Sequence, residues 1–496
     1  MTITFPNGLG LNVNTAEPCE GGWLLHGTDI IITHNYGACE FYREGWNSWS
    51  PSGWRKLDDE PLRIYGNPHR LLTADDSATD DPEHHQGSTV GALAFDDGQV
   101  LLLGALELGE PLVGADTTTM WGRSLTPDAT WFLGIGEETA IFGRYAELVA
   151  ERFHPSPNRC GPVFSTWYSC YENIDEQLIS GFLDELDGYG FDVFQIDDGW
   201  EQIVGDWTAN AGFKSGMRAM ADQIRAHHMR AGLWLSPFIC LPGSQTVAEH
   251  PDWLVKDASG EPLIAGYNWD SHYYALDTTL SPVKDHLHHL FTGLVDDGFD
   301  YFKLDFMYAG ALPGVRSQDL PREQVYREAI SLIREATGPD CFLLGSGVPM
   351  LASVGIVDAA RVGPDVAPYW DNTERDRDPS GAGALNSLAN SAARTWMRHW
   401  FIPDPDVVFF RSRRSLLDER SSQALRDMAM ICGFSSTSDP ISWLDPTEQD
   451  QLRAFLSATP QVTRLGRYRY QIDDRNVDFA PLLHAGRAEM EALLVK

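Results

Sequence analysis

From about residue 160 onward, short apolar runs alternate with amphipathic stretches of helical period, and no other feature constrains the fold as strongly. The apolar runs are rich in aromatic and β-branched residues and are bounded by Gly, Asp or Pro, which is typical of buried strands. Eight strands that alternate with helices over about 290 residues predict an α/β fold, a (β/α)8 TIM barrel. The predicted strands are Val163–Tyr168, Phe191–Ile196, Ala231–Phe238, Tyr301–Phe306, Cys341–Gly345, Ala359–Gly363, Val407–Arg411 and Gly433–Ser438.

The segments on either side of the barrel have a different character. Residues 1–155 contain only short apolar runs separated by Gly, Asp and Asn, and this pattern predicts an all-β domain. Within it, the polar and acidic stretch Asp75–Gln86 is expected to be an exposed loop. Residues 156–457 are assigned to the barrel, and residues 458–496 are expected to hold only a short β segment.

The net charge limits the class of partner. A formal charge of −34 and a pI near 4.6 argue against a nucleic-acid-binding protein, because the phosphates would be repelled. The same charge disfavours adhesion to an anionic membrane surface. We therefore expect a small molecule as the partner, with no nucleic acid and no membrane.

Cysteine spacing and the absence of targeting signals indicate a reducing, cytoplasmic setting. The seven cysteines form no C-x-x-C pair, so neither a disulfide framework nor a zinc ribbon is expected. His286, His288 and His289 share one helical stretch without an evident third ligand, so no metal site is expected. The chain starts without a basic region followed by an apolar one. No apolar run approaches the ~20 residues that span a bilayer.

Polar and aromatic residues recur at the predicted carboxyl ends of the barrel strands, where barrels of this type carry their chemistry. A Lys and an Asp share one face of the fourth strand, and such a buried pair is either a structural ion pair or part of a site. A single acidic strand end is often an ordinary helix cap. Several such ends converging on one rim favour a functional site, whose candidates are Trp167, Asp197, Asp198, Trp234, Lys303, Asp305, Arg361 and Asp365.

Carboxylates facing each other across a pocket with Trp walls suit glycoside hydrolysis. One carboxylate attacks the anomeric carbon, and the other protonates the leaving oxygen. Lys303 is expected to keep Asp305 ionised and nucleophilic, because a nearby positive charge favours the carboxylate. A drier environment around Asp365 would suit that residue to the role of the acid. Asp197 and Asp198 are expected to accept hydrogen bonds from sugar hydroxyls.

Three tryptophans lie in the Gly- and Ser-rich stretch Gly45–Trp54. They could fill a core, which is the commoner fate of Trp. They could also present an aromatic platform to a sugar, since the indole face is apolar while its edge can donate a hydrogen bond. The residues by themselves leave both interpretations open.

Eight short motifs in a constant order make the sequence resemble the α-galactosidases of glycoside hydrolase family 36. They are Trp167-Tyr168 with Asn173–Glu176, FQIDDGW, GDW at Gly205–Trp207, GLWLSPF, YFKLDF, LLGSGVP at Leu343–Pro349, RVGPDVAPYW, and PDPD at Pro403–Asp406. The resemblance implies a retaining α-galactosidase that needs no metal or organic cofactor. It also implies a β-sandwich domain ahead of the barrel and a smaller β domain after it, although residues 458–496 are few for a complete one.

The motif matches imply a role for each candidate. Asp305 matches the family's nucleophile and Asp365 its general acid/base, while Asp197 and Asp198 match the residues that hold O4 and O6 of galactose. The other matches are sugar-hydroxyl contacts for Lys303 and Arg361, pocket walls for Trp167 and Trp234, and the aromatic lent by the amino-terminal domain for Trp49, with Trp46 as an adjacent candidate. Ser346 stands where similar sequences carry Cys.

Several related activities fit the same residues. An α-N-acetylgalactosaminidase differs in the room around C2 of the sugar, and a β-L-arabinopyranosidase acts on a sugar that lacks C6. A transglycosylase of raffinose-type sugars would use the same covalent intermediate. A non-catalytic sugar-binding protein would keep the Trp walls, but it would have no need of both Asp305 and Asp365.

Overall fold

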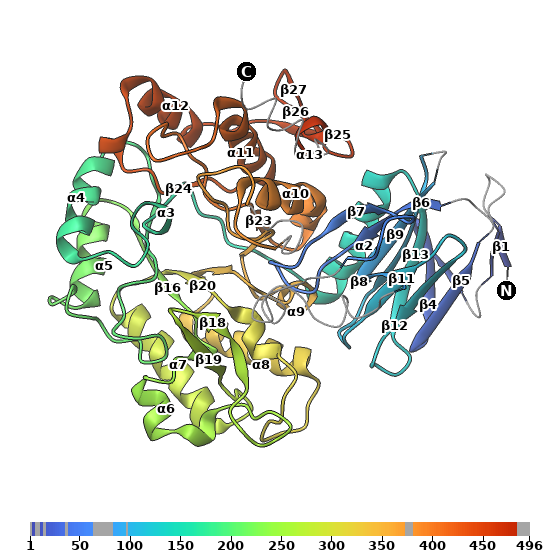
Figure 1. Ribbon diagram of the computed structural model, residues 1–496, viewed down its shortest axis with the longest axis horizontal. Helices are drawn as coiled ribbons and strands as arrows, with labels where there is room; N and C mark the ends of the chain where they lie inside the picture. Colours follow the sequence, from blue (N-terminus) through green and yellow to red (C-terminus); the bar gives the residue numbers. More distant parts are fainter. Residues whose placement is uncertain are drawn as a thin grey trace.

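The computed structural model describes residues 2–4, 10–12, 16–34, 38–62, 83–95, 98–372 and 380–483, and the structural statements below concern these residues. A sandwich of β-strands lies on one side of the molecule and a barrel of strands and helices on the other (Figure 1). The predicted succession of a β region, a (β/α)8 barrel and a short β segment is therefore confirmed.

The amino-terminal region is a sandwich of two antiparallel sheets. Its core lies between the sheets, because Leu101 and Leu103 of one sheet pack with Val113 and Met120 of the other. The six-stranded sheet has the order β1 (Thr2–Thr4), β2 (Gly10–Asn12), β5 (Asp29–Thr33), β12 (Thr119–Arg123), β11 (Leu112–Ala115) and β8 (His85–Ser88). The seven-stranded sheet has the order β3 (Glu17–Cys19), β4 (Gly22–His26), β13 (Thr130–Gly136), β10 (Val100–Ala105), β9 (Val90–Phe95), β6 (Ala38–Arg43) and β7 (Gly53–Lys56).

This region differs from its sequence-based description in two places. It ends in a helix, α2 (Glu138–Phe153), within the segment expected to be all-β. Tyr145 of α2 donates to the Ala105 carbonyl at 2.8 Å and packs against Trp400 of the barrel region, so α2 joins the two parts. Most of the expected loop Asp75–Gln86 lies outside the described residues, but its last two residues begin β8 and are buried rather than exposed.

Eight parallel strands form the barrel sheet. Their order is β23 (Ile402–Asp404), β22 (Ala359–Arg361), β21 (Phe342–Gly345), β20 (Tyr301–Leu304), β16 (Arg230–Leu235), β15 (Val193–Ile196), β14 (Val163–Ser165) and β24 (Ser436–Thr437). Just after β23, Val408 bridges to Thr437 of β24, and the Val408 N–H donates to the Ser436 carbonyl at 2.8 Å. This bridge joins the two edges of the sheet and closes the ring.

The seventh strand lies earlier than predicted. The run Val407–Arg411 is apolar and rich in strand-forming residues, yet apart from the bridge at Val408 it is a buried connection. The strand itself is Ile402–Asp404, where Pro403 lowers the strand signal because proline cannot donate to a sheet ladder.

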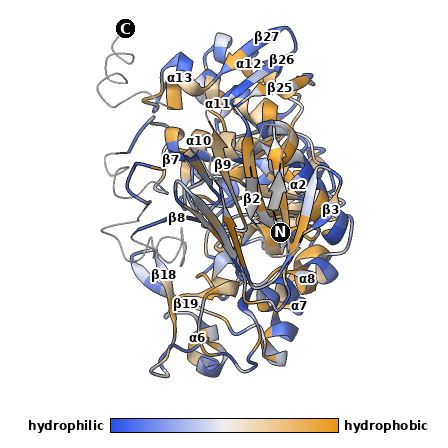
Figure 2. Cartoon of the chain, turned by 90° about the vertical axis from the view of Figure 1, so that its right-hand side faces the viewer, coloured by the Kyte–Doolittle hydropathy of each residue, from blue (hydrophilic) through white to orange (hydrophobic). Residues whose placement is uncertain are grey.

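Helices surround the barrel sheet and cover its outer face. The main ones are α4 (Glu176–Leu186), α5 (Met217–Ala226), α7 (Ser281–Asp296), α8 (Arg322–Thr337), α10 (Ala384–Arg394) and α11 (Glu419–Cys432). Shorter ones are α3 (Trp167–Cys170), α6 (Gln245–Glu249) and α9 (Met350–Ser353). Figure 2 shows hydrophobic and hydrophilic residues along the same helices, as expected for helices with one buried face. Among the residues that the structure describes, no helix combines the length and apolar character needed to cross a bilayer.

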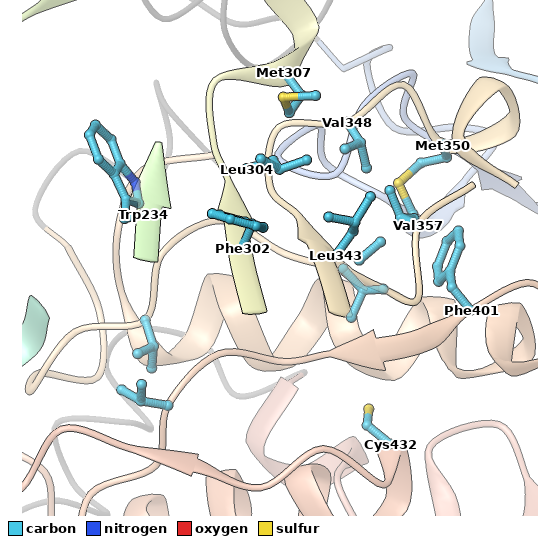
Figure 3. Packing of buried hydrophobic residues seen from close by; sticks show 14 of the residues in the cluster. Trp234, Phe302, Leu304, Met307, Leu343, Val348, Met350, Val357, Phe401 and Cys432 are labelled. Carbon is cyan, nitrogen blue, oxygen red and sulfur yellow. The ribbon is translucent and has the colours of Figure 1, made fainter. Parts of the chain in front are cut away.

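Alternation along β20 sorts its side chains as the sequence predicts. Tyr301 points into the barrel, where it stacks on Phe342 with ring centroids 5.1 Å apart. Phe302 and Leu304 point outward into the layer between strands and helices, together with Leu343 of β21 (Figure 3). Phe306 departs from the predicted alternation, because it follows the strand with a left-handed backbone (φ 54°) and its ring lines a pocket.

After the barrel helix α12 (Pro446–Leu456), the strands β25 (Val462–Gly466), β26 (Arg469–Ile472) and β27 (Arg475–Asp478) form a small antiparallel sheet, followed by α13 (Ala480–Leu483). Ion pairs tie this sheet to both parts of the chain. Arg464 and Arg467 each bond to Glu138 of α2 at 2.6 Å, and Arg475 bonds to Asp427 of α11 at 2.6 Å. The expected short carboxyl-terminal β segment is therefore present.

Candidate active site

A pocket of about 300 Å³ opens at the carboxyl ends of the barrel strands. Eight of the nine predicted site residues line it, namely Trp49, Trp167, Asp197, Asp198, Trp234, Lys303, Asp305 and Asp365. The ninth, Arg361, lies behind the wall and contacts Asp365. Seven lining residues were not predicted, namely Tyr267, Asn268, Tyr273, Phe306, Pro364, Ser380 and Ala382. In the described part of the chain, no group of three or more His, Cys, Asp or Glu side chains could hold a metal ion.

Two hydrogen bonds hold the Asp305 carboxylate at the end of β20. The Trp234 indole N–H donates to Oδ2 at 3.0 Å, and the Phe306 backbone N–H donates to Oδ1 at 2.9 Å. Burial raises the pKa of Asp305, Lys303 lowers it, and Asp365 raises it, so that the net shift is upward. This direction is opposite to the sequence-based expectation, because burial outweighs the nearby positive charge. Asp365 contributes to this upward shift, so the two carboxyl groups are close enough to interact electrostatically.

Lys303 forms its ion pair with Asp197 rather than with Asp305. Its Nζ lies 2.9 Å from Asp197 Oδ2, and both side chains are buried. Gln195 Nε2 donates to the same oxygen at 2.5 Å. Burial lowers the pKa of Lys303, but Asp197 and Asp305 raise it by more, so the lysine carries its charge inside the pocket.

Asp198 lies beside a glutamate that the sequence did not single out. Its Oδ2 accepts from the Trp269 indole N–H at 2.8 Å, and its carboxyl group hydrogen-bonds to the buried Glu201. Burial and the neighbouring Glu201 raise the pKa of Asp198 to about 9. The acceptor role toward a sugar hydroxyl that the sequence suggests for Asp198 stays a prediction.

Asp365 is the more accessible of the two candidate catalytic carboxylates, with 46% of its side chain exposed. Arg361 is the last residue of β22, and its Nη2 donates to Asp365 Oδ1 at 3.1 Å. The Gly383 N–H donates to the Asp365 backbone carbonyl at 2.9 Å. This exposure differs from the drier environment that the sequence suggested around Asp365.

Trp49 reaches the pocket from the amino-terminal region. Its indole N–H donates to Ser346 Oγ at 3.2 Å, and its ring lies edge-on to Phe306 with centroids 5.2 Å apart. Trp46 is buried under the Arg322 guanidinium and does not line the pocket. Trp54 is half-buried and packs against Tyr42, so the stretch supplies one residue of the pocket wall and two that pack away from it.

A buried arginine contributes several hydrogen bonds to the loop that carries Trp49. Arg394 of α10 is fully buried, and its Nε and Nη2 contact Glu44 Oε1 at 2.8 and 2.7 Å. The same guanidinium donates to the backbone carbonyls of Ser48 (2.8 Å), Asn47 (2.9 Å), Gly45 (3.3 Å) and Val362 (3.2 Å). It therefore ties the sandwich loop to the barrel beside the pocket.

Replacing Arg394 by Met is expected to lower the free energy of unfolding by about 3–5 kcal/mol, because Glu44 would be left as an unpaired buried charge. The KM for substrate should also rise, since Trp49 would lose its anchored loop. Chemical denaturation followed by tryptophan fluorescence measures the first effect. Arg398→Met is the control, because Arg398 is exposed and should change stability by no more than about 0.5 kcal/mol. Equal stability of the two variants would contradict the prediction.

The unpredicted aromatic wall comes from a hairpin inserted after β16. Strands β18 (Ile264–Asn268) and β19 (Ser271–Ala275), with β17 (Ile239–Cys240), form a small sheet over the pocket. Trp269 and Asp270 make the turn with positive φ angles of 48° and 53°. Such turns usually carry Asn-Gly or Asp-Gly, so the Trp-Asp pair gives no hairpin signal in the sequence. The closely spaced aromatic residues of YNWDSHYY could have indicated the hairpin.

The chain is similar to α-galactosidases in sequence and in fold. A family model described as Melibiase matches residues 137–333. An α-galactosidase from Thermus thermophilus, solved with p-nitrophenyl α-D-galactopyranoside, is 39% identical, with 97% of this chain and 99% of that chain covered and a TM-score of 0.90. Its structure with stachyose gives 38% identity, coverage of 92% and 99%, and a TM-score of 0.86.

More distant relatives agree on the fold or on part of the chain. A glycoside hydrolase family 36 α-galactosidase from Geobacillus stearothermophilus is 14% identical over 92% of this chain and 74% of its own, with a TM-score of 0.60. The α-galactosidase 2 of Pediococcus pentosaceus is 29% identical over 160 residues, 30% of this chain and 22% of its own length. The alignments to the first three curated relatives span only 22% to 30% of their lengths. Because the match to the Thermus enzyme covers nearly all of both chains, this chain belongs to the melibiase family, the α-galactosidases of glycoside hydrolase family 36.

Proposed function

We propose that the protein is an exo-acting α-galactosidase that releases terminal α-D-galactosyl residues from galacto-oligosaccharides with retention of configuration. The observation that carries this proposal is the pocket itself, in which Asp305 follows β20 and Asp365 follows β22, on the same wall of strand ends. A pair of carboxylates that flanks one sugar is typical of a glycosidase, and membership in glycoside hydrolase family 36 supports the retaining form of the reaction.

In the first step, Asp305 attacks the anomeric carbon while Asp365 protonates the departing glycosidic oxygen. The bonds from Trp234 and Phe306 fix both Asp305 oxygens, so the attacking group is oriented before the substrate arrives. In the second step, Asp365 takes a proton from water, and the oxygen of that water displaces Asp305 from the sugar. The exposure of Asp365 suits a group that meets both the leaving alcohol and the incoming water.

Hydroxyl recognition in this proposal falls to the buried polar residues of the pocket. Asp197 and Asp198 offer hydrogen-bond acceptors, and the Lys303 ammonium offers donors. The rings of Trp49, Trp167 and Trp234 would pack on the apolar face of the sugar. The complexes of the Thermus relative with an aryl α-galactoside and with stachyose support this substrate class.

We also propose that the protein works in the cytoplasm. All seven cysteines are free thiols, which suits a reducing compartment.

The substrate assignment is tested with 4-nitrophenyl α-D-galactopyranoside, α-N-acetylgalactosaminide and β-L-arabinopyranoside. The α-galactoside is expected to give the highest kcat/KM. NMR of the first product formed should show the α-anomer of galactose, because two displacements restore the original configuration. Preference for either other glycoside would overturn the substrate, and a β-anomeric first product would overturn the mechanism.

A further inference from the structure

Behind the pocket, a buried aspartate accepts hydrogen bonds on both of its oxygens from four different donors. Asp406 is 5% exposed. Its Oδ2 accepts from the Tyr168 hydroxyl, from Arg361 Nη2 at 2.5 Å and from the Val366 N–H at 2.9 Å. Its Oδ1 accepts from the Val407 N–H at 2.8 Å. Burial raises the pKa of Asp406 and the Arg361 guanidinium lowers it, with the net shift upward. The four donors favour the ionised carboxylate, which accepts without donating.

Arg361 connects this carboxylate to the candidate acid/base. The same Nη2 atom that donates to Asp406 also donates to Asp365 Oδ1 at 3.1 Å. Asp404 Oδ2 lies 4.0 Å from Arg361 Nε. The groups that face the guanidinium are therefore the carboxylates of Asp365, Asp404 and Asp406 and the Tyr168 hydroxyl. The Lys303 ammonium is also close enough to interact electrostatically with Arg361.

The backbone around Asp406 is held in an unusual shape. Asp406 has a φ of 82°, which costs free energy in a residue with a side chain. Asp404 Oδ1 accepts from the Asp406 N–H at 2.7 Å and keeps this shape in place. The bond from Val366 to Asp406 also anchors the residue that directly follows Asp365.

We propose that Asp406 is the positioning residue of the acid/base Asp365, and that it acts by offsetting the charge of Arg361. This inference rests on the proposed function. A guanidinium 3.1 Å from Asp365 favours the ionised form, which cannot donate a proton to a leaving group. The negative charge of Asp406 on the same nitrogen weakens that effect. The bond to Val366 keeps Asp365 aimed into the pocket.

The test is the pH dependence of kcat/KM in Asp406→Asn, measured on a galacto-oligosaccharide and on 4-nitrophenyl α-galactoside. The alkaline limb reports the acid of the free enzyme. It is expected to move to lower pH by about one unit, because one negative charge next to Arg361 is lost. The loss of kcat/KM at neutral pH should be larger for the galacto-oligosaccharide, whose leaving alcohol needs the proton.

Two further variants separate positioning from folding. Asp358 directly precedes β22, the strand that ends at Arg361. Asp358→Asn removes a buried carboxylate that accepts from Arg334 at 2.5 Å and from the Leu343 N–H at 2.7 Å. It should lower stability but leave the alkaline limb in place. Tyr168→Phe removes one hydrogen-bond donor to Asp406 but keeps the negative charge of its carboxylate. With one donor fewer, that charge offsets Arg361 more strongly, so the alkaline limb of kcat/KM should move slightly to higher pH.

An unmoved limb in Asp406→Asn, with equal losses on both substrates, would overturn the inference. If Asp406→Asn does not fold, a limb in Tyr168→Phe that stays or moves to lower pH would overturn it instead. A wild-type protein that hydrolyses no α-galactoside contradicts the proposed function. A normal wild-type enzyme with unshifted variants contradicts only the role of Asp406.

Discussion

Asp305→Ala is expected to lower kcat on every α-galactoside by about 10⁴-fold or more, because it removes the group proposed to form the covalent intermediate. The loss should be equally severe for activated and natural leaving groups, since the missing group is the nucleophile and not the acid. Initial rates with 4-nitrophenyl α-galactoside and with a galacto-oligosaccharide measure it.

Azide distinguishes a lost nucleophile from a damaged pocket. In the space vacated by Asp305, azide can attack the anomeric carbon while the bond to the leaving group breaks and Asp365 supplies its proton. The product is then β-galactosyl azide, with inverted configuration, because only one displacement has occurred.

Asp300→Ala is the matched control for Asp305→Ala. Asp300 directly precedes β20 at the opposite end from the pocket, where it pairs with Arg230 at 3.2 Å. That variant should keep nearly full activity. Rescue of Asp305→Ala with retained configuration would contradict the assignment of Asp305 as the nucleophile.

Asp365→Ala is expected to separate substrates by their leaving groups. Loss of a general acid costs about 10²–10⁴-fold for an alcohol that must be protonated as it departs. A 4-nitrophenolate leaves readily without a proton, so the first step with the nitrophenyl substrate should slow much less. Comparison of kcat/KM values for the two substrates, which reports the first irreversible step, measures the difference.

In this variant azide should act at the second step. Without Asp365 to activate water, the galactosyl enzyme is expected to accumulate, and azide needs no base to attack it. Displacement of Asp305 by azide then gives α-galactosyl azide with net retention. Equal losses for both substrates, or an inverted azide product, would show that Asp365 is not the acid/base.

The alternation of strands and helices in the barrel could be predicted from the sequence, because hydrophobic periodicity is a local property. A strand such as Tyr301–Leu304 shows its two faces in consecutive residues, whatever lies around it. The parallel arrangement then brings the carboxyl ends of all strands to one rim, so residues more than a hundred positions apart could be predicted to line one pocket. The prediction was wrong for the seventh strand, which is Ile402–Asp404 and not Val407–Arg411, because Pro403 lowers the strand signal of this segment.

The partner of each charge was decided only by the tertiary structure. Lys303 was expected to keep Asp305, two residues away, in its ionised form, but it forms its ion pair with Asp197, which follows another strand. Asp305 has a raised pKa because burial, which depends on every neighbouring element, outweighs the nearby lysine.

The supporting shell of the pocket was likewise absent from any local pattern. Glu201 bonds to Asp198, Asp406 reaches Arg361 from 45 residues further along the chain, and Arg394 holds a loop of the sandwich 350 residues away. Residue type and local period determine which side chains reach the rim of strand ends. Distances, burial and shared hydrogen-bond donors determine what those side chains do there, and these exist only once the chain has folded.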